Sequence, residues 1–136
     1  MKPESRIQRD VRRYLALKGI TSVAVPNGAH LAGDKAARIR QMAAMKADGL
    51  MPGFPDLQLF HPVIASTAFV EIKTPQGRLS KEQKGCIDWL AGLGHKVAVI
   101  RSVDDMAEAL REWGWWDGTV TIGEATARVV ERLRVA

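Results

Sequence analysis

Apolar residues recur along this chain with two spacings, one typical of helices and the other of strands. Helical spacing predicts helices over residues 3–18, 34–48, 80–93 and 104–113. Alternating or short continuous apolar runs predict strands over residues 21–25, 56–60, 67–73 and 96–101. This order predicts an α/β fold in which helices flank a mixed sheet, with an extra helix between the first two strands. The last strand is almost wholly apolar, so we expect it to be central and buried.

The predicted helices carry signals at their ends and apolar stripes along one side. Pro3 suits a first helical turn, and Ser80 and Gln83 have the spacing of a capping box. The residues that we expect to face the core are Ile7, Val11, Tyr14 and Leu15 in the first helix, Ile87, Leu90 and Leu93 in the third, and Met106, Leu110 and Trp113 in the fourth. The second helix has only a weak apolar stripe, formed by Ile39, Met42 and Met45 or Lys46.

The two middle strands predict a hairpin whose register follows from the sequence. If residues 56 and 71 face each other on antiparallel strands, the numbers of every facing pair sum to 127 and the turn is centred on Val63 and Ile64. Glu71 and Lys73 are two residues apart, so they share one face of their strand. The hairpin therefore brings together Asp56, Glu71 and Lys73. Two carboxylates and an ammonium in one place suit a divalent metal and a phosphate.

The pattern of apolar and polar residues changes after Gly114. Residues 115–118 predict a turn, residues 119–122 a short strand and residues 124–135 a final helix. We expect residues 1–113 to form one domain and residues 114–136 to be an extension. The extension either packs on the core or makes a dimer contact, and the sequence alone leaves both open.

Composition narrows the class of protein. A length of 136 residues suits one domain with a hydrophobic core, and a formal charge of +5 favours a polyanionic partner such as nucleic acid. The single cysteine, Cys86, excludes an internal disulfide and indicates a reducing compartment. It falls on the apolar side of a predicted helix, so we expect a buried thiol. No apolar run approaches ~20 residues and the N-terminus has no apolar signal core, so we expect a soluble cytoplasmic protein.

The acid–lysine group has the composition needed to hydrolyse a phosphodiester. That reaction requires a cation beside the phosphate, an oriented water and neutralisation of developing charge. Asp56 and Glu71 offer oxygen ligands for Mg²⁺ or Mn²⁺, and the backbone carbonyl of Ile72 could add another. Lys73 would orient the water and stabilise the transition state. Glu4 could join them directly or through water, if the first helix packs on the sheet.

Other residues are candidates for contact with nucleic acid. Arg6, Arg9 and Arg13 form a basic ridge that can follow a phosphate backbone, although such a ridge can also be a solvated face. Gln8 lies one helical turn from Glu4 on the same side. The tryptophans at 113, 115 and 116 could stack on bases, but packing is the better reading for rings of this size.

The motifs resemble those of the PD-(D/E)xK nuclease superfamily, and the fuller set resembles its virus-type replication-repair branch, the VRR-NUC domains. The resemblance covers roughly residues 4–101, and five elements in order are more specific than the short acid–lysine pattern alone. The elements are Glu4-x-x-x-Gln8, Val25-Pro26-Asn27-Gly28, Gly53-Phe54-Pro55-Asp56-Leu57, Glu71-Ile72-Lys73 and Leu79-Ser80-x-x-Gln83.

The resemblance implies a restriction-endonuclease-like core of order α-β-β-β-α-β and a metal-dependent nuclease acting on structured DNA. Position by position, it makes Asp56 and Glu71 metal ligands and Lys73 catalytic. It makes Glu4 the acid of the first helix and Gln83 a supporting glutamine. For these two, structural roles stay open, because Glu4 suits a helix N-terminus and Gln83 suits a cap.

Small stand-alone members of the branch, many of them viral, resemble dimeric Holliday-junction resolvases, which implies a homodimer acting on branched DNA. Flap, linear duplex and RNA substrates remain alternatives, as does a non-catalytic nucleic-acid-binding subunit. Some relatives carry an arginine or glutamate near residues 28–30, and this chain does not. His30 is the candidate replacement for that contact. Asn27 is a candidate contact as well, or a residue that holds the turn.

Overall fold

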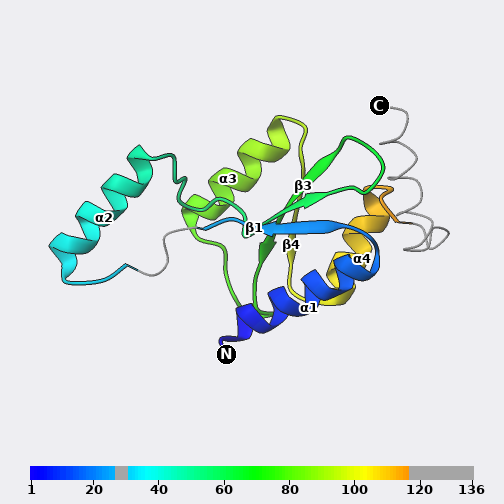
Figure 1. Ribbon diagram of the computed structural model, residues 1–136, viewed down its shortest axis with the longest axis horizontal. Coiled ribbons are helices and arrows are strands. Elements are labelled where there is room, and N and C mark those ends of the chain that lie inside the picture. The colour runs from blue at the N-terminus through cyan, green and yellow to red at the C-terminus, as the bar shows by residue number, and fades with distance from the viewer. Residues whose placement is uncertain (27–30, 117–136) are drawn as a thin grey trace.

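The computed structural model describes residues 1–26 and 31–116, and its elements follow the predicted order (Figure 1). Asn27, His30 and the elements predicted after residue 116 lie outside the described residues. The described elements are α1 (Pro3–Leu17), β1 (Thr21–Ala24), α2 (Lys35–Ala47), β2 (Leu57–Phe60), β3 (Thr67–Ile72), α3 (Lys81–Gly92), β4 (Lys96–Ile100) and α4 (Val103–Glu112).

The four strands form one mixed sheet in the order β1-β2-β3-β4. β1 and β2 are antiparallel, β2 and β3 are antiparallel, and β3 and β4 are parallel. Leu57 faces Val70 and Phe60 faces Thr67, so facing residue numbers sum to 127 and the predicted hairpin register is confirmed. The prediction of a central last strand is wrong, because β4 is an edge of the described sheet. Its apolar sequence reflects contacts with α3 and α4.

Helices cover both faces of the sheet (Figure 1). On one face, α1 and α4 enclose the core with Val11, Leu15 and Leu110. Leu57 and Leu59 are buried in that core, so their neighbours Asp56 and Gln58 point to the opposite face, where α3 lies. The alternation along β2 thus sends the aliphatic residues into the core and Asp56 away from it.

α3 buries its cysteine but not the whole predicted stripe. Cys86 and Leu90 are buried, and the Cys86 thiol donates to the carbonyl of Pro52 at 3.4 Å, which confirms the prediction of a buried thiol. Leu93 is 61% exposed, so its predicted place in the core is wrong. The helix ends at Gly92, which leaves Leu93 as the C-cap.

α2 lies apart from the sheet (Figure 1) and has no buried residue. Ile39, which belongs to the weak apolar stripe predicted for this helix, is 60% exposed. The helix begins after Asp34, whose side chain accepts a hydrogen bond from the backbone of Ala37. The weak apolar stripe of α2 is therefore not buried against any other part of the described chain.

The end of α4 carries the aromatic residues into the core. Trp115 is 5% exposed and belongs to the core cluster, while Trp113 and Trp116 pack against it from the outside. Packing is therefore what these three rings do in the structure. None of the described helices is long and apolar enough to cross a membrane.

Candidate active site

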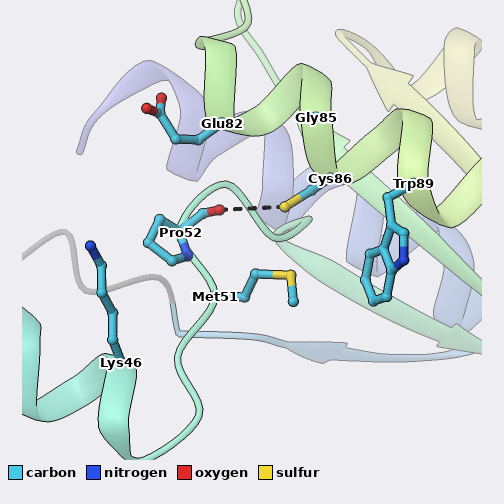
Figure 2. Close-up of a pocket in the computed structure, with 7 residues that line it drawn as sticks. All are labelled: Lys46, Met51, Pro52, Glu82, Gly85, Cys86 and Trp89. Carbon is cyan, nitrogen blue, oxygen red and sulfur yellow. Dashed lines mark hydrogen bonds between the residues drawn. The ribbon is translucent and has the colours of Figure 1, made fainter.

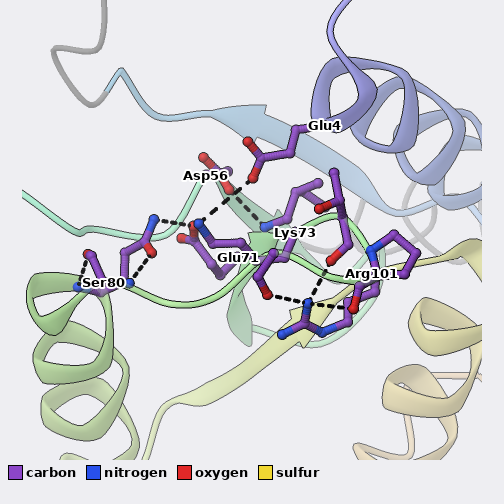
Figure 3. Close-up of polar contacts among 11 residues, drawn as sticks. Glu4, Asp56, Glu71, Lys73, Ser80 and Arg101 are labelled. Atoms are coloured by element: carbon purple, nitrogen blue, oxygen red, sulfur yellow. Dashed lines mark hydrogen bonds and ion pairs between the residues drawn. The ribbon is translucent and has the colours of Figure 1, made fainter.

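Asp56, Glu71 and Lys73 meet where the β2–β3 hairpin opens away from its turn (Figure 3). The carbonyl of Asp56 accepts from the backbone N–H of Val25 at 2.9 Å, so its main chain pairs with the side of β1. Asp56 and Glu71 are therefore a facing pair without mutual backbone hydrogen bonds, the kind whose side chains approach closely. The N–H of Ile72 donates to Oδ2 of Asp56 at 2.7 Å, which fixes that carboxylate against β3.

Glu71 is the only charged residue among the buried polar positions in the described ranges, with 2% of its surface exposed. Its Oε1 accepts from Nε2 of Gln83 at 2.8 Å, and its Oε2 is buried without a hydrogen-bond partner in the described structure. Burial and the charge of Asp56 raise the pKa of Glu71 to about 8, although the Lys73 ammonium acts in the opposite direction. Burial also raises the pKa of Asp56, against the lowering effect of its hydrogen bond from Ile72.

Gln83 connects the start of α3 to Glu71. Its backbone N–H donates to Oγ of Ser80 at 3.1 Å, and its Oε1 accepts from the Ser80 N–H at 2.8 Å, which confirms the predicted capping box. Because Oε1 is used by the cap, the Nε2 group is left to donate to Glu71. The cap thus orients the amide that holds the buried carboxylate.

Lys73 follows β3 directly and points toward Glu4 in α1. The two side chains form an ion pair at 3.8 Å, with the Lys73 side chain 14% exposed and that of Glu4 52% exposed. The backbone N–H of Lys73 donates to the carbonyl of Ile100, which continues the pairing with β4 past the strand end. Glu4 therefore reaches the site through Lys73, as the packing of α1 on the sheet had been expected to allow.

The side chains of this site suit a divalent cation that prefers oxygen ligands. The available oxygen atoms are those of the Asp56 and Glu71 carboxylates and of the Ile72 carbonyl, and Oε2 of Glu71 has no other partner among the described residues. In a strand a residue's N–H and C=O point to the same side, so this carbonyl lies on the side of Asp56. No group of three His, Cys, Asp or Glu side chains arranged to hold a metal occurs among the described residues, so the set depends on main-chain or water oxygens.

Close packing explains why a glycine stands at position 53, in the loop before β2. Gly53 has a φ of +81°, and a Cβ there would lie 2.4 Å from the backbone carbon of Glu82. The loop that delivers Asp56 is therefore pressed against the first turn of α3, which delivers Gln83. This contact fixes the two site residues relative to each other.

Arg101 is a residue of the site region that sequence reasoning missed. It comes directly after β4, and its Nη1 donates to the carbonyls of Thr74 and Gly77 at 2.6 Å each (Figure 3). Its backbone N–H donates to Oδ2 of Asp105 at 2.9 Å. The available signal was its place after a strand parallel to β3, since parallel strands end at the same edge of a sheet.

The candidate nucleic-acid contacts on α1 are accessible. Arg6, Arg9 and Arg13 are exposed and Gln8 is half-buried. Arg13 also forms an ion pair with Asp10 at 3.7 Å, so part of the ridge has a structural partner.

A separate groove of about 450 Å³ lies between α2 and α3, lined by Met51, Trp89 and five other residues (Figure 2). It contains none of the acids or the lysine of the site.

Comparison with known proteins gives a family and a similar fold. The family model of the VRR-NUC domain matches residues 2–104. A solved structure described as a VRR_NUC domain protein is similar to this chain with a TM-score of 0.58 and 20% identity, over 83% of this chain and 88% of that one. At that identity the likeness shows the fold, and the restriction-endonuclease-like arrangement of helices around a mixed sheet is consistent with it. Among curated proteins none matches the sequence.

Proposed function

Since the chain belongs to the VRR-NUC family, whose members are nucleases of the PD-(D/E)xK type, we propose that it is a metal-dependent endonuclease that cuts branched DNA as a homodimer. The observation that carries this proposal is the buried carboxylate of Glu71, which lies beside Asp56 and leaves one oxygen unpartnered. Burying such a group costs free energy unless something neutralises it. The hydrogen bond from Gln83 and the ammonium of Lys73 compensate that cost only in part, and a bound cation would supply the remainder.

The residues of the chain divide the work of hydrolysis between them. The ammonium of Lys73 orients the attacking water and stabilises the negative charge that develops on the phosphate. Glu4 holds that ammonium through the ion pair at 3.8 Å, and Gln83 holds the Glu71 carboxylate through its amide. The N–H of Ile72 keeps Asp56 in place before any ligand binds. Prior orientation of these groups lowers the cost of reaching the transition state.

Asp56, Glu71 and the Ile72 carbonyl are the residues that would hold Mg²⁺ or Mn²⁺, with Glu4 joining through water. Such an ion supplies a Lewis acid for the phosphate and lowers the pKa of a bound water. The raised pKa of Glu71 supports this assignment, because a nearby cation favours the charged carboxylate. Metal binding would then release a proton from the pair near neutral pH.

The substrate would lie along α1 and the open end of the hairpin. Arg6, Arg9 and Arg13 would bind phosphates, with Gln8 between that ridge and the site. We also propose contacts by Asn27 and His30, which lie outside the described residues. We assign residues 1–113 to the nuclease domain and 114–136 to an extension, whose first residues include Trp115 of the core.

Dimerisation is part of the proposal because two symmetric cuts in a junction call for two sites related by a two-fold axis. α2 and the extension are the candidate contacts between copies. The exposed surface of α2 supports this choice, because no residue of this helix is buried within the described chain. Light scattering at micromolar concentration should give the mass of a dimer, and a monomer would contradict this part of the proposal.

The decisive experiment incubates the protein with labelled four-way junctions, flaps, linear duplexes and RNA, with Mg²⁺, with Mn²⁺ or with a chelator. We expect junction cleavage with either metal and none with the chelator. Asp56→Ala is the matched variant that removes a carboxylate from the site. No cleavage with any metal, or equal cleavage by Asp56→Ala, would contradict the proposed activity, and preferred cleavage of another substrate would change the substrate class.

A non-catalytic binding subunit makes a different prediction in calorimetry. The nuclease should bind Mn²⁺ at pH 8 with heat that disappears in Asp56→Ala. A binding subunit would show no Mn²⁺ binding but would keep salt-sensitive affinity for DNA.

A further inference from the structure

The turn between Lys73 and α3 is held by a single guanidinium. The N–H of Gly77 donates to the carbonyl of Thr74 at 3.0 Å, which closes the turn. Nη1 of Arg101 donates to the carbonyls of Thr74 and Gly77 at 2.6 Å and approaches that of Pro75 at 3.3 Å. Three carbonyl groups of this turn are therefore directed to one side, toward Arg101.

This arrangement sends backbone donors to the other side of the turn. In a trans peptide the N–H points away from the C=O of the preceding residue. Because the carbonyls of Pro75 and Gly77 point to Arg101, the N–H groups of Gln76 and Arg78 point away from it. Neither N–H has a backbone partner within the described ranges. A backbone N–H that has no partner within the described chain is free to donate to an anion.

A groove of about 470 Å³ lies between this turn and the first turn of α1. Arg6 supplies its one charged side chain, and Gln76 and Thr74 add polar groups. The remaining lining residues are Met1, Pro3, Ile7 and Pro75. The groove borders the proposed active site, because Thr74 follows Lys73 and Pro3 precedes Glu4. Figure 3 shows Arg101 reaching the turn on the side away from Glu4.

We propose that this groove binds the phosphate next to the one that is cut in the same DNA strand. The N–H group of Gln76 and the guanidinium of Arg6 are its donors. Arg101 is a positioning residue, which keeps the turn in the conformation that exposes the Gln76 N–H. The inference rests on the proposed nuclease function and adds to it a phosphate subsite.

A binding assay with singly modified DNA tests the subsite apart from cleavage. Junctions carry one neutral methylphosphonate at each position near the expected cut, and their affinity is measured by fluorescence anisotropy without metal. For the wild type we expect one flanking position where the modification weakens binding about tenfold, as expected for the loss of charge-assisted hydrogen bonds. For Arg101→Gln the same modification should cost almost nothing, because the subsite is already lost.

Further variants separate the turn from general stability. Arg101→Lys keeps a cation that can donate to the same carbonyls, so it should retain part of the effect of the modification. Gln76→Ala keeps the backbone donor and Gln76→Pro removes it, so only the latter should abolish the positional effect. Lys84→Ala, an exposed change on α3, is the control for loss of charge. Thermal unfolding monitors the fold of every variant.

Cleavage kinetics give the second readout. Arg101→Gln should raise KM about tenfold while kcat changes less, since the groove binds a phosphate that does not react. Equal sensitivity of wild type and Arg101→Gln to every methylphosphonate would overturn the subsite, as would an unchanged KM. A wild type that shows the positional effect in binding but cleaves nothing would instead defeat the proposed nuclease activity and leave the phosphate site in place.

Discussion

At one end of the β2–β3 hairpin Glu71 is buried beside Asp56, and at the other end His61 is partly buried against Trp115. Nδ1 of His61 accepts from the N–H groups of Val63 and Ile64 at 3.0 and 3.1 Å, and its ring meets that of Trp115 edge to face. Glu71 has one oxygen satisfied by Gln83 and one without a partner. Nδ1 of His61 is thus satisfied within the chain, although Nε1 of the neighbouring Trp115 is buried without a partner among the described residues. At the open end it is a carboxylate oxygen of Glu71 that lacks a partner, and this oxygen can serve a ligand.

This difference separates polar groups that hold the fold from polar groups that serve a reaction. A histidine whose nitrogen accepts two backbone N–H groups closes a turn and has its bonds within the chain. A carboxylate with a raised pKa beside a second carboxylate stores unfavourable electrostatic energy. Substitutions at the two ends should therefore change different quantities, which gives a way to test the comparison.

The largest expected effect belongs to the removal of the ammonium at the open end. Lys73→Ala should lower the cleavage rate by about 10²- to 10⁴-fold, because an oriented proton-transfer or charge-stabilising group contributes that much. The melting temperature should change little, because the partner Glu4 is half exposed and such ion pairs stabilise weakly. Cleavage assays and thermal unfolding measure the two effects. A large drop in melting temperature with retained cleavage would reverse the comparison.

The second largest effect should be the pH dependence of the free energy of unfolding of the metal-free protein. The pKa of Glu71 is 4.5 in its ordinary state and about 8 here, so between these values the folded chain binds more protons than the unfolded chain. Stability should then fall as pH rises from about 5 to about 8. Glu71→Gln should flatten this slope and raise stability at pH 8 by about 1–2 kcal/mol, since it keeps an acceptor for Gln83 and removes the charge. Denaturant unfolding at several pH values tests it, and a wild type with no slope would contradict it.

Gln83 allows its structural and electrostatic roles to be separated by a matched pair of variants. Gln83→Ala removes the side-chain half of the capping box and the hydrogen bond to Glu71, while the Ser80 Oγ still accepts from the backbone N–H of residue 83. This loss should cost about 1 kcal/mol of stability. Gln83→Glu keeps an acceptor for the Ser80 N–H but places a third carboxylate against Glu71. We expect Gln83→Glu to preserve the cap and to weaken cleavage more than Gln83→Ala does. Equal cleavage by both variants would indicate that Gln83 acts only as a cap.

The closed end should give the smallest effect, confined to stability. Burial lowers the pKa of His61, so below about pH 6.5 the unfolded chain binds more protons and stability falls as pH drops, opposite in sign to Glu71. His61→Ala should remove this acid-side loss and cost about 1 kcal/mol at pH 8, with cleavage unchanged. Thermal unfolding at pH 5.5 and 8 and the cleavage assay test it. Reduced cleavage would mean that the two ends are coupled.

Much of this arrangement could be predicted because the signals are local. The register of the hairpin follows from two motifs whose numbers sum to 127, and alternation along a strand then decides that Glu71 and Lys73 share a face. The capping box follows from the spacing of Ser80 and Gln83. The strand Lys96–Ile100 could also be predicted from its apolar residues, but its place at the edge of the described sheet could not. Its apolar composition reflects contacts with α3 and α4, which an edge strand can make as well as a central one.

The sequence by itself determined the order of the elements, the hairpin register and the meeting of Asp56, Glu71 and Lys73, since each depends on spacing along one short segment. Only the tertiary structure decided that Gln83 caps α3 and holds Glu71 at once, and that Arg101 fixes the turn after Lys73. Those contacts join residues 12 and 27 positions apart. The physical reason is that their partners are set by how helices and strands pack, which no local spacing encodes.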